Sequence, residues 1–222
     1  IKIIMEKVTY NINDFPFKEK LQNIFNTNDL TTLNEDLQVL TREKDQSTKY
    51  HKLFYRWIRN PDIINLYDKF INEIVRPLYN EQIVYQAIPT FRIMYSNNIA
   101  VGEFHKDKHY RDEKWAAKVK EDNFYFPFTD AFETNTIWVE SEEDKGDFEP
   151  INCKYGELVR WDGSNLTHGN KINKTGRTRI SMDFRVIKYS NYQPSDYGSV
   201  NTETKFKIGG YYKIIDNDKS RV

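Results

Sequence analysis

The chain has 222 residues, of which 38% are hydrophobic and 15% aromatic, enough to bury the core of one sizeable domain. Lys and Arg number 33, as do Asp and Glu, and this balance favours neither a nucleic-acid nor an anionic-membrane partner. The single cysteine, Cys153, excludes a disulfide framework and a cysteine-based metal cluster. With only a short apolar run at the N-terminus and no stretch of membrane-spanning length, we expect a soluble, cytoplasmic protein.

The first third of the chain, residues 1–81, is predicted to form a mainly helical layer. A short helix is expected over residues 17–25, and residues 47–60 place four large apolar side chains on one helical face. The next helix has its own start signal, because Asn60 can cap it and Pro61 suits its first turn.

Residues 82–188 show a different pattern, in which short apolar or alternating runs are separated by turn sequences such as DKGD and DGSN. The runs are QIVYQAI, TFRIMY, NFYFPF, NTIWVE, GELVRW and RTRISMDFRVI. Roughly eight strands of this kind match a double-sheet jelly roll. The predicted fold is therefore mainly β with α, a double-stranded β-helix (jelly roll, cupin-like) core beside the helical layer, in one domain of residues 1–222. Residues 189–222 are expected to form an irregular cover or an added edge strand.

The stretch GEFHKDKHY holds two of the four histidines and suggests half of a metal site. In extended backbone, residues two apart point the same way, so His105 and Asp107 can bind one ion together. His168 is the best candidate for a third ligand, since it lies 61 residues after Asp107 (168 − 107), beside the final strand, where a jelly roll returns to an earlier strand. Two histidines and one carboxylate are the ligand set of non-haem Fe(II) oxygenases.

The final strand alternates four apolar residues with Arg179, Ser181, Asp183 and Arg185. If the charged face lines the barrel interior, its charges are expensive unless they are paired or bound to a ligand. An arginine supported by a serine hydroxyl suits a bidentate grip on a ligand carboxylate.

The order HKD … THGN … TRISMDFR resembles the HxD … H … RxS pattern of the Fe(II)/2-oxoglutarate-dependent oxygenases. Over residues 90–188 the chain is more narrowly similar to the phytanoyl-CoA-dioxygenase-like and streptomycin-biosynthesis-type branches. The resemblance implies iron ligation by His105, Asp107 and His168, with 2-oxoglutarate and O₂ as co-substrates.

The same resemblance implies roles for further residues. Arg179, eleven residues after the distal histidine (179 − 168), matches the arginine that holds the far carboxylate of 2-oxoglutarate, and Ser181 matches its helper hydroxyl. Arg177, expected on the same strand face, and Arg185 remain competitors for the grip. Two positions on strands that often contribute to co-substrate binding in the family are Asn135 and Tyr95.

The implied activity is oxidation of a C–H bond in a small molecule, with release of succinate and CO₂. Related halogenases replace the ligand carboxylate with a small residue, so the presence of Asp107 favours hydroxylation over halogenation. The branch suggests a natural-product or carbohydrate-related substrate. Residues 106–128 are a candidate lid, since they include the charged run after Asp107. No sequence feature specifies an oligomeric state.

Two other functions compete with this one. A cupin-like metal enzyme that uses no oxo-acid would need a fourth protein ligand, for which His109 is the candidate, and would not need Arg179. A non-catalytic jelly-roll module for sugars would use aromatic stacking platforms and no iron. His51 is expected at the surface or between helices.

Overall fold

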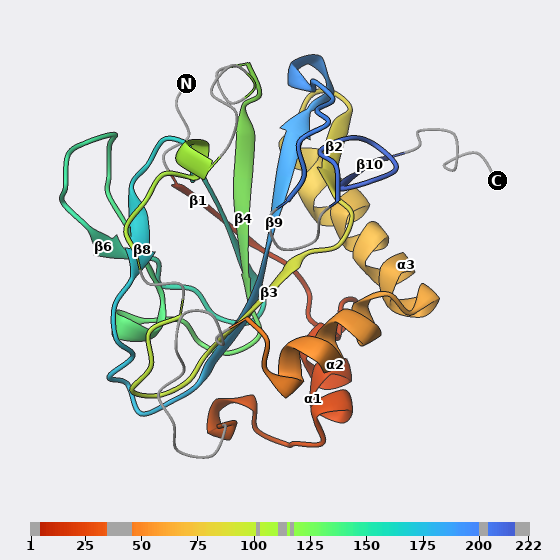
Figure 1. Ribbon diagram of the computed structural model, residues 1–222. Helices are drawn as coiled ribbons and strands as arrows, with labels where there is room; N and C mark the ends of the chain where they lie inside the picture. The colour runs from red at the N-terminus through yellow and green to blue at the C-terminus, as the bar shows by residue number, and fades with distance from the viewer. Residues whose placement is uncertain are drawn as a thin grey trace.

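Two antiparallel sheets face each other in the computed structural model, which describes residues 5–34, 46–100, 103–110, 115, 118–199 and 204–215 (Figure 1). The larger sheet has the order β1 (Met5–Thr9), β7 (Glu157–Trp161), β4 (Glu121–Pro127), β9 (Arg179–Lys188), β2 (Ile83–Gln86) and β10 (Tyr212–Ile214), while β3 (Thr90–Met94) also pairs with β9. The smaller sheet has the order β6 (Glu149–Pro150), β5 (Ile137–Val139) and β8 (His168–Asn170). The predicted jelly-roll class is confirmed.

Helices from the N-terminal region cover the outer face of the larger sheet (Figure 1). They are α1 (Phe17–Phe25), α2 (Lys49–Ile58) and α3 (Pro61–Phe70), which continues into a π-turn, η2 (Ile71–Val75). Short 3₁₀ turns are η1 (Leu30–Thr32), η3 (Arg76–Leu78), η4 (Asp107–Tyr110), η5 (Glu133–Asn135) and η6 (Tyr189–Asn191). None of the described helices is long and apolar enough to cross a membrane.

The helix starts follow local sequence signals. The predicted helix over residues 17–25 is confirmed as α1. Asn60 caps α3 as predicted, because its side-chain oxygen accepts from the backbone N–H of Asp62 at 2.9 Å, and Pro61 occupies the first turn. Such a cap is worth about 1 kcal/mol.

Strand β9 has one apolar face and one polar face. The apolar face packs in the core, and the polar face points into the interior between the two sheets. Its apolar face, formed by Ile180, Met182, Phe184 and Val186, is buried in the same core as the helices. Phe184 stacks on Phe124 of β4 with ring centroids 5.1 Å apart. The alternation that predicts this strand from sequence therefore also sets which of its side chains reach the interior.

Some expectations need correction. The helical layer of residues 1–81 also contributes strand β1, which pairs with β7 at the edge of the larger sheet. Most of the charged run after Asp107 lies outside the described residues, but residues 121–127 form the central strand β4, so that part of the candidate lid is fixed. The tail does add an edge strand, since β10 pairs with β2. His51 is neither exposed nor between helices: its ring packs edge-on against Phe91 of β3, 5.0 Å between centroids.

Candidate metal centre

Two of the sequence-predicted ligands are tied together through the backbone. His105 and His168 form an antiparallel bridge in which each N–H donates to the other's carbonyl, at 2.8 and 2.9 Å. Their ring centroids lie 4.4 Å apart. His168 belongs to the smaller sheet, because it is the first residue of β8. The structure therefore brings together residues 63 positions apart (168 − 105).

Asp107 completes the cluster. Its Oδ1 lies 3.5 Å from Nε2 of His105 and 3.6 Å from Nε2 of His168. Among the described residues, the three ligand atoms of this group lie within 4.8 Å of one another. His109 is exposed on η4 and is not a member of the group, so the described residues give no support to a fourth ligand.

The donor atoms have the chemistry that a divalent metal requires. Nδ1 of His105 lies 2.7 Å from the carbonyl of Glu103, and Nδ1 of His168 lies 3.0 Å from that of Leu166. Because a carbonyl can only accept, each Nδ1 carries the proton and each Nε2 presents its lone pair toward the cluster. Two neutral imidazoles and a carboxylate fit Fe(II).

The second oxygen of Asp107 is held by two residues from the larger sheet. Its Oδ2 accepts from Nδ2 of Asn123 at 2.9 Å and from Nη2 of Arg185 at 2.7 Å. Arg185 in turn donates through Nη1 to the hydroxyl of Tyr211 at 3.0 Å. These contacts aim Oδ1 at the histidines and leave it as the metal-facing oxygen.

Burial and charge set the protonation of the cluster. Burial opposes ionisation of Asp107, but the positive charge of Arg185, with the histidines and Asn123, holds its pKa well below the ordinary value. Burial lowers the pKa of His168. For His105 burial is the largest single influence and acts in the same direction, but the hydrogen bonds to Asp107 and to the carbonyl of Glu103, together with the charge of Asp107, outweigh it and raise the pKa. The carboxylate is therefore ionised at neutral pH.

Arg179 lines the same cavity as the three candidate ligands and is buried, with 2% of its surface exposed. Its Nη1 donates to Oγ of Ser181 at 2.9 Å, and its Nε donates to the carbonyl of Asn135 at 2.9 Å. Its Nη2 lies 3.6 Å from Sδ of Met94. Among the described residues no carboxylate lies within 4.0 Å of this guanidinium. A buried cation without an anion is costly, so the position calls for an anionic ligand.

The other predicted co-substrate residues lie elsewhere. Arg177 precedes β9 and is exposed, so it does not share the inward face with Arg179. The side chain of Asn135 faces away from the cavity: its oxygen accepts from the N–H of Phe132 at 2.7 Å, and only its backbone carbonyl reaches Arg179. Tyr95 belongs to the core shared with the helices and does not line the cavity.

Sequence reasoning overlooks two polar residues of the cavity. Asn123 on β4 gives no motif signal, because it stands among aromatic residues in a strand. Arg92 on β3 donates through Nε to Oδ1 of Asp183 at 2.9 Å, and its buried Nη1 has no hydrogen-bond partner among the described residues. Its position opposite Ser181 in the strand register is a signal that only the pairing of β3 with β9 reveals.

Comparison with known proteins finds one relative along nearly the whole chain. The chain is 33% identical over 212 residues to the streptomycin biosynthesis protein StrG of Streptomyces griseus, covering 94% of this chain and 98% of StrG. No protein-family model matches.

Among solved structures, the non-haem α-ketoglutarate-dependent carbocyclase SnoK from nogalamycin biosynthesis shares the fold. Its TM-score is 0.56 at 8% identity, covering 96% of this chain and 92% of SnoK. The apo form of EctD from S. alaskensis superposes with a TM-score of 0.47 at 12% identity, covering 84% of this chain and 74% of EctD. The identity and coverage shared with StrG place this chain in the family of that streptomycin biosynthesis protein.

Proposed function

We propose that this oxygenase-type enzyme is an Fe(II)- and 2-oxoglutarate-dependent dioxygenase that hydroxylates a C–H bond of a small molecule. In the reaction one oxygen atom of O₂ enters the product hydroxyl, and the other enters the succinate formed as 2-oxoglutarate loses CO₂. The similarity to a streptomycin biosynthesis protein supports a natural-product or carbohydrate-related substrate.

The observation that carries the proposal is the environment of Arg179. Metal clusters of this ligand type serve several chemistries, but a buried guanidinium in the same cavity, without a carboxylate partner among the described residues, favours an organic acid as co-substrate. Ser181 supports the same interpretation, because its hydroxyl fixes one side of the guanidinium fork and can donate its proton to a bound carboxylate.

The residues of the chain have distinct tasks in this proposal. His105, His168 and Asp107 would hold the iron, which when bound supplies activation of O₂ coupled to oxidation of the oxo-acid. Arg185 and Asn123 hold Asp107 in one orientation, so that its free oxygen faces the histidines.

Two further residues orient the co-substrate and exclude water. Arg179 would bind the far carboxylate of 2-oxoglutarate and thereby fix which way its keto end points. The ring of Trp161 packs edge-on against His168, with centroids 4.6 Å apart, and shields that ligand from solvent.

The test is an anaerobic titration of the protein with Fe(II) and 2-oxoglutarate, in which a weak visible charge-transfer band is expected. Arg179→Ala should abolish the band at 2-oxoglutarate concentrations that saturate the wild type. Arg177→Ala is the matched control, since this arginine is exposed and outside the cavity, and it should leave the band unchanged.

The alternatives give different results in the same titration. Retained iron without any band would support a cupin-like metal enzyme that uses no oxo-acid, and a band lost in His109→Ala would point to a fourth ligand. Failure to retain iron would support a non-catalytic sugar-binding module. Coupled succinate release in the presence of candidate substrates then identifies the molecule that is oxidised.

A further inference from the structure

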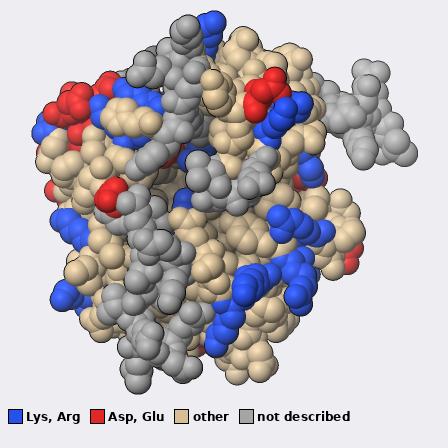
Figure 2. All heavy atoms as spheres, in the orientation of Figure 1, with Lys and Arg blue, Asp and Glu red and all other residues tan. Residues whose placement is uncertain are grey.

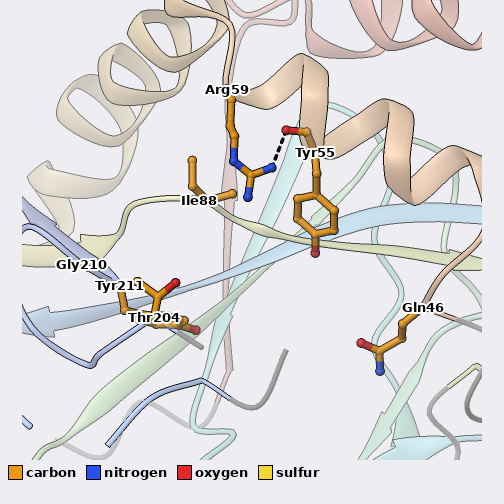
Figure 3. A pocket seen from close by; sticks show the side chains of 7 residues that line it. All are labelled: Gln46, Tyr55, Arg59, Ile88, Thr204, Gly210 and Tyr211. Atoms are coloured by element: carbon orange, nitrogen blue, oxygen red, sulfur yellow. Dashed lines mark hydrogen bonds between the residues drawn. The ribbon is translucent and has the colours of Figure 1, made fainter. Parts of the chain in front are cut away.

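A second cavity, larger than the one at the metal cluster, lies between α2 and the C-terminal cover (Figure 3). Its volume of about 500 Å³ is within the range of small-molecule sites. The residues that line it are Tyr55 and Arg59 on and just after α2, Ile88 from the β2–β3 turn, Gln46, and Thr204, Gly210 and Tyr211 of the cover. In Figure 3 these side chains surround one space in front of the larger sheet.

This cavity is next to the metal cluster. Tyr211 lines it, and the same tyrosine hydroxyl accepts from Arg185, whose other nitrogen donates to Asp107. On the opposite wall, the hydroxyl of Tyr55 accepts from the N–H of Phe91, the residue before Arg92 of the metal cavity. One layer of side chains therefore separates the two spaces, and a molecule in the larger one lies beside the candidate iron ligands.

The helix that forms one wall is strongly basic. Lys49, Lys52, Arg56 and Arg59 are exposed at spacings of three, four and three residues, which places them along one stripe of α2 and its C-cap. No Asp or Glu occurs from the N-cap Thr48 to Arg59. Figure 2 shows blue side chains gathered over this part of the surface.

Three of these four cations lack an anionic partner among the described residues. Among the described residues, no ion pair involves Lys52, Arg56 or Arg59, and no carboxylate lines the cavity. The guanidinium of Arg59 donates to the carbonyl of Tyr55 at 2.7 Å and lies 5.6 Å from the ring centroid of that tyrosine. Its position is thus fixed at the rim of the cavity, with donors left for a ligand.

We propose that this cavity binds a ligand that carries a phosphate group held by Arg59. Several cations along one stripe favour a doubly charged phosphate over a single carboxylate, because the attraction grows with the charge of the ligand. This phosphate site does not rest on the proposed function.

The test uses the full-length, metal-free protein and inorganic phosphate as the probe, with acetate at equal ionic strength for comparison. Titration calorimetry should show saturable phosphate binding in roughly the millimolar range and none for acetate. Arg59→Gln should weaken phosphate binding about tenfold or more, and Arg59→Lys should weaken it less, since the charge remains. Arg177→Gln, an exposed arginine outside both cavities, should leave the affinity unchanged.

Several results would overturn the inference. They are non-saturable phosphate binding, equal weakening by Arg59→Gln and Arg177→Gln, and unaltered affinity in Arg59→Gln. Thermal unfolding of each variant is the control for folding, and Arg59→Gln should keep the Tm of the wild type because the side chain is exposed. The Fe(II)–2-oxoglutarate band should persist in Arg59→Gln, so loss of the phosphate site is distinguishable from failure of the proposed function.

Discussion

Replacing Arg185 by methionine removes the charge that compensates Asp107 while it keeps a side chain of similar length. Arg185 lies 2.7 Å from Oδ2 of Asp107 and 3.6 Å from a carboxylate oxygen of Glu121, and 16% of its side chain is exposed. The change therefore leaves a buried carboxylate at the metal cluster without its cation.

The expected loss of stability follows from that burial. Removing one partner of a buried ion pair costs about 3–5 kcal/mol. The lower end applies here, because Asn123 still donates to Asp107, and Tyr212 still donates to Glu121. A loss of about 3 kcal/mol corresponds to a fall in Tm of about 6–12 °C for a chain of this size.

The pH dependence has a defined sign. In the wild type, burial would raise the pKa of Asp107, but the charge of Arg185 holds it well below the ordinary value. The stability gained from the ionised carboxylate is therefore present above the unfolded-state pKa of about 3.9 and is lost as the pH falls through the lower folded-state value. In Arg185→Met burial prevails and the pKa rises. The stability difference between the proteins should be largest near pH 7 and should shrink on acidification.

Thermal unfolding of both proteins, with and without Ni(II), separates this cause from lost packing. A divalent ion compensates Asp107 directly, so Ni(II) should raise the Tm of Arg185→Met more than that of the wild type. The same Tm difference with and without Ni(II), and at pH 7 and pH 4.5, would refute the electrostatic account. Arg185→Lys, which keeps the charge, is the control and should recover part of the stability.

The remaining predictions concern the helical layer and the strand that carries His168. Burial lowers the pKa of His51 to about 4, so its neutral form is favoured in the folded state and stability is lost as the pH falls from 6.5 toward 4. The loss of stability reaches about 3 kcal/mol. His51→Asn keeps a side-chain partner for Thr48 and should abolish this dependence of stability on pH. Urea unfolding at pH 8 and pH 4.5 measures the difference. Gly169→Ala would place a Cβ 2.9 Å from the ring of Phe104 and should lower the free energy of unfolding by about 1–3 kcal/mol. It should also weaken Ni(II) binding, and an unchanged Ni(II) affinity in titration calorimetry would contradict this. Asn60→Ala should lower the free energy of unfolding by about 1 kcal/mol, and a gain of stability would exclude capping by this side chain.

Much of the fold is predictable because its signals are local. The cap at Asn60 and the proline after it define the start of α3 from two adjacent residues. Strict alternation over residues 179–186 predicts both a strand and which side chains share its inward face. The three candidate ligands are predictable for a similar reason, since the HKD pair needs only extended geometry and His168 is the remaining histidine close to a strand.

Other features depend on distant pairing and leave no local trace. Strand β1 is stabilised by β7, about 150 residues later, so its own five residues do not reveal it. The roles of Asn123 and Arg185 depend on the register of β4 and β9. The burial of His51 depends on how α2 packs on β3, which a helical pattern cannot show.

The mutual backbone hydrogen bonds between His105 and His168 have a consequence for how the protein handles its ion. Folding already places the two imidazoles side by side, so the conformational entropy of bringing them together is lost on folding and not on binding of an ion. Binding and release of the proposed metal ion would then require only ligand exchange at a preassembled site, without refolding of the barrel. Metal-free protein would therefore keep the two imidazoles in their binding positions.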